Sequence, residues 1–250
     1  MQKILRMLLW MMMCLSPAGI PVAVAAGEPA EVQRYVERRG EHAKPVLWRL
    51  THDDGYQLIY QSPEETHVTQ TDAALQTTSW HMSNALKEMV VQATREANAI
   101  ALRGTCKGQA IQERFELDAD PWFQATSLSL RDFVRSPENT ITFWTLRPDT
   151  LKPLKLTATK VALETLKTAD ASVDALKIEL RATGWRAPFW RSHYWFRASD
   201  GLLLRFEGQA GPSRANPIVI DYTGPGPVET SSALLPLFSL WQANQNLVFD

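Results

Sequence analysis

Cysteine is nearly absent from this chain of 250 residues, which contains only Cys14 and Cys106. Cys14 lies in an N-terminal stretch that we expect to be removed, and its neighbour Met13 is not the small residue that precedes the cysteine of a lipidation signal. Cys106 then has no partner for an internal disulfide. The fold must rest on its hydrophobic core, for which the length and the 45% of hydrophobic residues are sufficient.

The chain also lacks an excess of charge of either sign. It has 26 basic and 27 acidic residues, and removal of Lys3 and Arg6 with the N-terminal stretch leaves 24 against 27, a net charge of −3. Proteins that bind nucleic acid neutralise phosphates with a basic face and have a high isoelectric point. The charge balance therefore argues against a nucleic-acid partner.

Familiar catalytic motifs are missing as well. The sequence has no Gly-x-Ser-x-Gly elbow, Ser-x-x-Lys pair, P-loop or dinucleotide fingerprint. Its five histidines are scattered, and no two stand two or four positions apart, as metal ligands on one strand or helix often do. His52-Asp53-Asp54 is explained by a turn, since Gly55 follows it. We therefore expect no catalytic residues, no metal and no cofactor.

The N-terminus has the three parts of a cleavable secretory signal. Lys3 and Arg6 are followed by a short apolar stretch from Met7 to Leu15, and the small residues Ala23 to Ala26 offer cleavage points. A transmembrane helix needs about 20 apolar residues, roughly twice as many as this stretch provides. We expect residues 1–26 to be removed, the mature chain to be periplasmic, and no transmembrane segment to remain.

A change of pattern follows the signal. Residues 27–45 form a polar segment, which fits either a helical or a disordered interpretation. From Val46 apolar and polar residues alternate, which is typical of strands with one solvated face. Asp53-Asp54-Gly55 indicates a hairpin, because Asp-Gly supplies the positive φ of a tight turn. The strands expected here are Val46–Thr51, Tyr56–Tyr60, Thr66–Thr69, Thr77–Met82, Ala97–Leu102 and Ala110–Phe115, with Gly104–Gly108 as the last loop.

The alternation of apolar and polar residues is interrupted in the middle of the chain. Leu128–Arg135 is predicted to form one short helix, and Thr140–Leu146 is a β-prone strand. Residues 225–250 are expected to be a linker and a short amphipathic helix. The strands expected in the last third are Leu154–Leu166, Val173–Ala182, Phe189–Arg197, Leu202–Glu207 and Pro217–Tyr222.

Short strands separated by turns, with no alternation of strands and long helices, indicate antiparallel pairing. We predict a mainly β (β-rich α+β) fold, in which one long curved antiparallel sheet or half-barrel carries a few peripheral short helices. No Pro/Ser-rich linker interrupts residues 46–224. We therefore expect one antiparallel β domain over this range.

Three stretches carry a family resemblance: Thr159–Thr165 leading through a turn to Val173–Leu180, Tyr194–Glu207 with its Asp-Gly turn, and Pro217–Tyr222. In these features residues 154–222 resemble DUF3108, a bacterial exported domain family of unknown function. The turn Thr168–Ser172 differs, because it lacks the expected glycine. The resemblance implies a long curved antiparallel sheet behind a signal peptide. It implies no activity, since none is established for the family.

Aromatic and basic residues are densest in one short region. Aromatic rings offer apolar area and arginine offers a planar, bidentate charge, a combination that suits the head and tail of an amphiphile or a sugar ring. The structural alternative places the aromatics in the core and the arginines in solvent. The candidate ligand-binding residues are Trp185, Trp190, Arg191, His193, Trp195 and Arg197.

The hypothesis from sequence is an exported, non-catalytic protein whose concave sheet face binds an apolar or amphiphilic envelope component, such as a lipid, or an envelope protein. One alternative is a hydrolase acting on an envelope polymer or ester. It would need Cys106 or His193 beside a carboxylate in a pocket. Another alternative is a protein-interaction scaffold without a small ligand.

Overall fold

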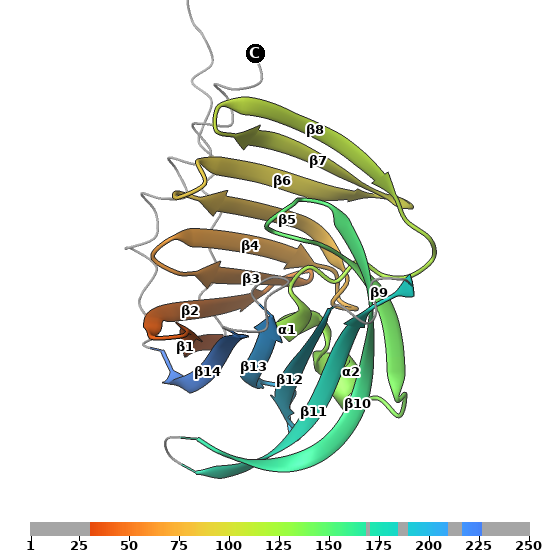
Figure 1. Ribbon diagram of the computed structural model, residues 1–250. Helices are drawn as coiled ribbons and strands as arrows, with labels where there is room; N and C mark the ends of the chain where they lie inside the picture. The colour runs from red at the N-terminus through yellow and green to blue at the C-terminus, as the bar shows by residue number, and fades with distance from the viewer. Residues whose placement is uncertain (1–30, 169–170, 185–189, 210–216, 227–250) are drawn as a thin grey trace, which may run out of the picture.

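The computed structural model describes residues 31–168, 171–184, 190–209 and 217–226. These residues form one fourteen-stranded sheet that curves around two short helices (Figure 1). Each strand pairs with its neighbours in antiparallel fashion. The predicted fold class is confirmed.

The element bounds are as follows. The helices are α1 (Thr126–Ser129) and α2 (Arg131–Arg135). The strands are β1 (Glu31–Arg39), β2 (His42–His52), β3 (Tyr56–Gln61), β4 (Glu65–Thr71), β5 (Thr77–Asn84), β6 (Met89–Glu96), β7 (Ala99–Cys106), β8 (Gln109–Glu116), β9 (Thr140–Leu146), β10 (Pro153–Lys167), β11 (Ser172–Ala182), β12 (Arg191–Arg197), β13 (Leu203–Gln209) and β14 (Pro217–Pro225).

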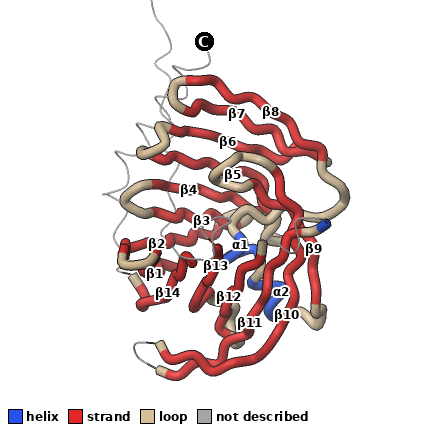
Figure 2. Tube along the Cα trace, viewed as in Figure 1, coloured by secondary structure: helices blue, strands red, loops and turns tan. Residues whose placement is uncertain are grey.

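The strand order explains where the helices lie. From one edge to the other the order is β8 down to β1, then β14 down to β9, so β1 and β14 pair in the middle. Tyr35 there stands opposite Tyr222. β8 and β9 are consecutive in the sequence but form opposite edges of the sheet. The connection between them, residues 117–139, crosses the concave side and carries α1 and α2 (Figure 2).

This crossing connection also covers one edge of the sheet. Trp122 forms a parallel bridge with Trp144 of β9, and Phe123 N donates to Trp144 O at 2.8 Å. Thr77 N, at the start of β5, donates to Trp122 O at 2.8 Å. The edge strand β9 is thereby tied to β5, while β6, β7 and β8 continue past the junction. The sheet therefore curves without closing into a barrel.

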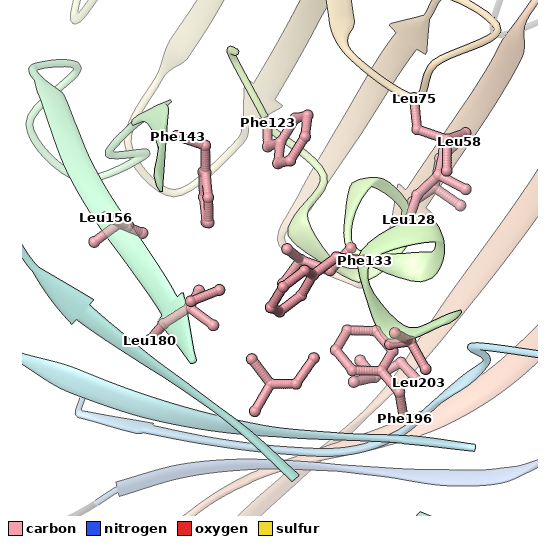
Figure 3. Close-up of a cluster of buried hydrophobic side chains, with 14 of the residues drawn as sticks. Leu58, Leu75, Phe123, Leu128, Phe133, Phe143, Leu156, Leu180, Phe196 and Leu203 are labelled. Carbon is pink, nitrogen blue, oxygen red and sulfur yellow. The ribbon is translucent and has the colours of Figure 1, made fainter. Parts of the chain in front are cut away.

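The main hydrophobic core lies between the helices and the concave face. Leu128, Phe133 and Val134 from the helices are all buried, as is Leu130 between the helices. They pack against apolar side chains of β1 to β3 and β9 to β13, and Phe133 lies at the centre of the cluster (Figure 3). Burial of these side chains is the main stabilising contribution, because each removes a large apolar area from water.

A bidentate ion pair fixes the helices to the middle of the sheet. Arg131 donates from both terminal nitrogens to the Glu31 carboxylate, each at 2.9 Å. Burial lowers the pKa of Arg131, but the hydrogen bonds and charge of Glu31 outweigh this and raise it. The pair therefore stays charged, and it joins α2 to β1 across 100 residues of sequence.

Several expectations were confirmed. A hairpin at Asp53–Gly55 joins β2 and β3, although Gly55 does not have the expected positive φ. β9 has the predicted bounds, and five strands occupy the last third in the described residues. The predicted helix over Leu128–Arg135 corresponds to α1 and α2, but these helices are not peripheral, because their apolar side chains belong to the main core.

Other expectations need correction. The helical or disordered interpretation of residues 27–45 is wrong from Glu31 onward, because Val32 and Tyr35 fill core positions of β1. β6 was not anticipated, and Cys106 ends β7, so the following turn is only Lys107-Gly108. The expected signal, residues 1–26, and the expected C-terminal helix lie outside the described residues. None of the helices in the described part of the chain is long and apolar enough to cross a membrane.

The position of Phe133 gives a stability prediction. We expect Phe133→Ala to lower the free energy of unfolding by about 3–5 kcal/mol, because it opens a cavity where the helices meet the sheet. Leu86→Ala is the matched control, since the Leu86 side chain is 75% exposed. Urea denaturation of both variants measures the effect. Equal losses would contradict the central role of the crossing connection.

Candidate functional site

The structure describes five of the six predicted ligand-binding residues, and it brings His193 and Trp195 together, with ring centres 5.9 Å apart. Trp185 lies outside the described residues. Trp190 packs against the main core, whereas Trp195 belongs to a separate small cluster with Leu202 and Leu204. Arg191 is exposed.

The other members of this group are engaged in contacts within the chain. Trp195 Nε1 donates to Glu164 at 2.8 Å, and Lys177 Nζ lies 4.8 Å from the centre of its ring. His193 Nε2 lies 3.4 Å from Glu179. Arg197 Nε donates to Asp200 Oδ1 at 2.8 Å, within the turn after β12, so Asp200 holds the pKa of Arg197 above its ordinary value. These contacts join Trp195 and His193 to neighbouring strands and Arg197 to the turn after β12.

The residues considered for a hydrolase are also apart. Cys106 lies on β7 and His193 on β12, and the strands from β6 to β1 and then β14 and β13 stand between them in the sheet. Cys106 Sγ lies 3.9 Å from Lys87 O. Within the described ranges, no group of three or more His, Cys, Asp or Glu side chains is placed to hold a metal ion.

A cavity of about 260 Å³ on the concave face is the stronger candidate. Its floor consists of two cross-strand rows on β2 to β5. In one row Trp48 faces Tyr60, which faces His67; in the other Leu58 faces Thr69, which faces Trp80. Successive side chains on a strand alternate between faces, so these registers place all six side chains on the same side of the sheet.

The crossing connection covers this floor. Gln124, Ala125, Thr126 and Ser127 line the cavity at the start of α1, together with Tyr194 of β12. Thr126 Oγ1 donates to the Tyr194 hydroxyl at 3.0 Å. Burial raises the pKa of Tyr194 to about 12, so its phenol is neutral and its proton remains available for donation.

Gln124 holds this cover in place. Its Oε1 accepts from Trp122 Nε1 at 3.0 Å and from Leu146 N at 2.9 Å, and its Nε2 donates to Leu146 O at 2.9 Å. A satisfied amide that bonds to the last residue of β9 fixes the connection at this point. The cavity wall is therefore anchored to both β5 and β9.

His67 is the central polar group of the floor. Its ring lies 5.2 Å from the ring of Tyr60 and 5.7 Å from that of Trp80. His67 Nε2 lies 3.7 Å from Glu65 Oε1, longer than an ordinary hydrogen bond but close enough for attraction to the carboxylate. The neighbouring His67 lowers the pKa of Glu65 to about 2, against the effect of burial, and a hydrogen bond from Asn84 adds to it.

Two buried indoles border the same space. Trp48 is 7% exposed and Trp80 is fully buried. Neither Nε1 atom has a hydrogen-bond acceptor among the residues that the structure describes. Buried donors without acceptors are uncommon in folded proteins, which marks this region as unusual within the sheet.

A larger hollow of about 750 Å³ lies over β6 to β8 and is lined mainly by polar and charged side chains such as Arg103, Gln112 and Arg114. Ligand sites are mostly apolar, with a few placed polar groups. The aromatic cavity fits this description better than the larger hollow does. It offers aromatic walls, one oriented imidazole and several hydroxyl groups, which suit binding of a small, partly apolar molecule.

Sequence reasoning missed this site because its residues come from β2, β3, β4, β5, the crossing connection and β12. The Asp53–Gly55 hairpin fixes the register of Trp48 and Tyr60, so their pairing was accessible from sequence. The position of the crossing connection over Trp48 and Tyr60 could not be predicted from the sequence, since it depends on the strand order.

The comparisons with known proteins bear on the fold. No family model and no curated protein matches the chain. Among solved structures, it is similar to the beta-barrel-like protein of the domain of unknown function DUF1849 from Brucella abortus, with a TM-score of 0.58 and 8% identity, over 79% of this chain and 97% of that one.

Two further structures are more distant. The hypothetical lipoprotein YmcC from Escherichia coli matches with a TM-score of 0.41 and 14% identity, over 79% of this chain and 86% of that one. A DUF1329 family protein from Desulfovibrio piger matches with a TM-score of 0.27 and 13% identity, over 82% and 88%. The likeness to the DUF1849 protein thus shows the fold alone, and the likeness to DUF3108 rests on the residues of the chain itself.

Two half-buried groups, Glu65 of β4 and His81 of β5, predict a pH dependence of stability. Burial, with the nearby His67, lowers the pKa of His81 from 6.5 to about 4, and the pKa of Glu65 falls from 4.5 to about 2. In each window the unfolded chain binds more protons, so stability falls as the pH falls: between 6.5 and 4 for His81, and between 4.5 and 2 for Glu65.

We expect His81→Gln to remove most of the decrease in the free energy of unfolding between pH 6.5 and 4.5, which is of order 1–3 kcal/mol. The decrease below pH 4.5 should persist in this variant. Thermal unfolding across this pH range measures it, with His52→Gln as the control on an exposed histidine. An unchanged profile in His81→Gln would show that His81 does not titrate as its burial implies.

Proposed function

We propose that this chain is an exported, non-catalytic binding protein whose aromatic cavity holds a small amphiphilic component of the bacterial envelope. The observation that carries the proposal is the cavity itself, with Trp48, Tyr60, Trp80 and Tyr194 around one imidazole. The sequence of the N-terminus supports export to the periplasm, and the DUF3108-like features of residues 154–222 agree with an exported sheet protein.

The packing of the concave face limits the size of the ligand. Phe133 and its neighbours pack over β1 to β3 and β9 to β13, which limits the space left for a ligand beside the cavity. Pockets for drug-sized molecules have volumes of roughly 300–1,000 Å³, somewhat more than this cavity. A headgroup or a short chain fits, whereas a full-length acyl chain does not fit without movement of α1 and α2.

The test is native mass spectrometry of the mature protein, purified gently from the envelope fraction. We expect a co-purifying molecule of defined mass, and an intact protein mass that corresponds to cleavage after Ala25 or Ala26. A mass that retains the N-terminal stretch would contradict export by a cleaved signal, and a protein that carries no ligand would contradict the binding proposal.

Variants assign the ligand to a site. Thr126→Phe should fill the cavity and abolish the adduct, and Tyr60→Ala, at a half-buried wall, should weaken it. Trp195→Ala is the matched control outside the cavity. If Trp195→Ala removes the adduct while both cavity variants retain it, the ligand binds near Trp195 on β12 instead. Circular dichroism confirms that each variant is folded.

A further inference from the structure

The chemistry of the cavity restricts the class of ligand beyond the proposed function, on which this inference rests. Among the described residues that line the cavity there is no Lys or Arg, so they offer no fixed cation to a phosphate or carboxylate. The polar side chains that line it include Thr69, Thr126, Ser127, Tyr194 and His67. Such a set favours a neutral headgroup with several hydroxyls over an anionic one.

The orientation of His67 decides which hydrogen-bonding role it takes. Nε2 faces the Glu65 carboxylate at 3.7 Å. Because a carboxylate attracts an N–H and repels a lone pair, Glu65 favours, of the two tautomers of a neutral imidazole, the one protonated on Nε2. Nε2 is buried and forms no hydrogen bond to a residue in the described part of the chain, so this attraction is its main polar contact there. The lone pair then resides on Nδ1.

Asn84 fixes the Glu65 carboxylate in the position from which it selects the His67 tautomer. Asn84 Nδ2 donates to Glu65 Oε2 at 2.9 Å, and Asn84 is itself buried. The carboxylate thus has one oxygen fixed by the amide and the other turned towards His67. With Nε2 protonated, the other ring nitrogen of His67, Nδ1, is a hydrogen-bond acceptor.

We infer that the cavity takes a neutral, hydroxylated headgroup, such as one sugar ring of an amphiphile, which donates a hydroxyl hydrogen to Nδ1 of His67. The aromatic faces of Trp48 and Tyr60 suit the apolar C–H face of such a ring, and the Tyr194 phenol donates to one of its oxygens. Glu65 is a positioning residue that sets the tautomer.

The binding test uses three probes below their critical micelle concentrations: octyl glucoside, methyl octanoate and sodium octanoate. Isothermal titration with the mature wild-type protein should show that octyl glucoside binds at least tenfold more tightly than either octanoate compound. His67→Phe keeps an aromatic ring but removes the acceptor, and it should weaken octyl glucoside binding roughly tenfold, as expected for one buried hydrogen bond, with little effect on methyl octanoate.

The possible outcomes distinguish failure of this inference from failure of the proposed function. If none of the probes binds and the protein from the envelope is free of ligand, the proposed function fails. If an octanoate compound binds as well as octyl glucoside, or His67→Phe leaves octyl glucoside binding unchanged, the cavity is a ligand site but the inferred headgroup is wrong.

A direct measurement covers the case in which His67→Phe does not fold. Long-range ¹H–¹⁵N NMR of the wild-type protein reports which nitrogen of His67 carries the proton. We expect protonation on Nε2, and a shift towards the Nδ1-protonated tautomer in Glu65→Gln. A wild-type His67 protonated on Nδ1 would overturn the inference, because that nitrogen would then be a donor.

Discussion

The packing of the crossing connection against the concave face is the constraint on which the rest of the structure depends. β8 and β9 are consecutive in the chain and lie at opposite edges of the sheet, so residues 117–139 must pass over the concave side. That passage brings Phe133 and its neighbours into the core and anchors β9 to β5 through Trp122. The same passage covers the two rows of β2 to β5 and so creates the cavity.

Curvature and cavity are therefore linked. A sheet with a solvated concave face would expose the indoles of Trp48 and Trp80 to water, whereas here the connection encloses them. Enclosure strengthens the electrostatic attraction between Glu65 and His67, since fewer water molecules screen it. A polar pair that would contribute little at the surface thereby defines the hydrogen-bonding character of the cavity.

The sequence predicted local structure better than long-range arrangement. Alternation and Asp-Gly turns identified the hairpins, because both the pleat and the turn geometry are local. β1 was missed because charged residues on the solvated face of Glu31–Arg39 masked the buried Val32 and Tyr35. The aromatic group of β12 was correctly seen as dense, but Trp190 and Trp195 pack in different clusters, and no periodicity argument shows which neighbours enclose a tryptophan.

The most direct test of the central claim is an experimental structure of the mature protein purified from the envelope without added detergent. The account predicts density that belongs to no protein atom in the cavity between Trp48, Trp80 and Tyr194, with a polar atom beside His67. A cavity filled by ordered water alone, or closed by movement of the Thr126 and Tyr194 side chains, would contradict it.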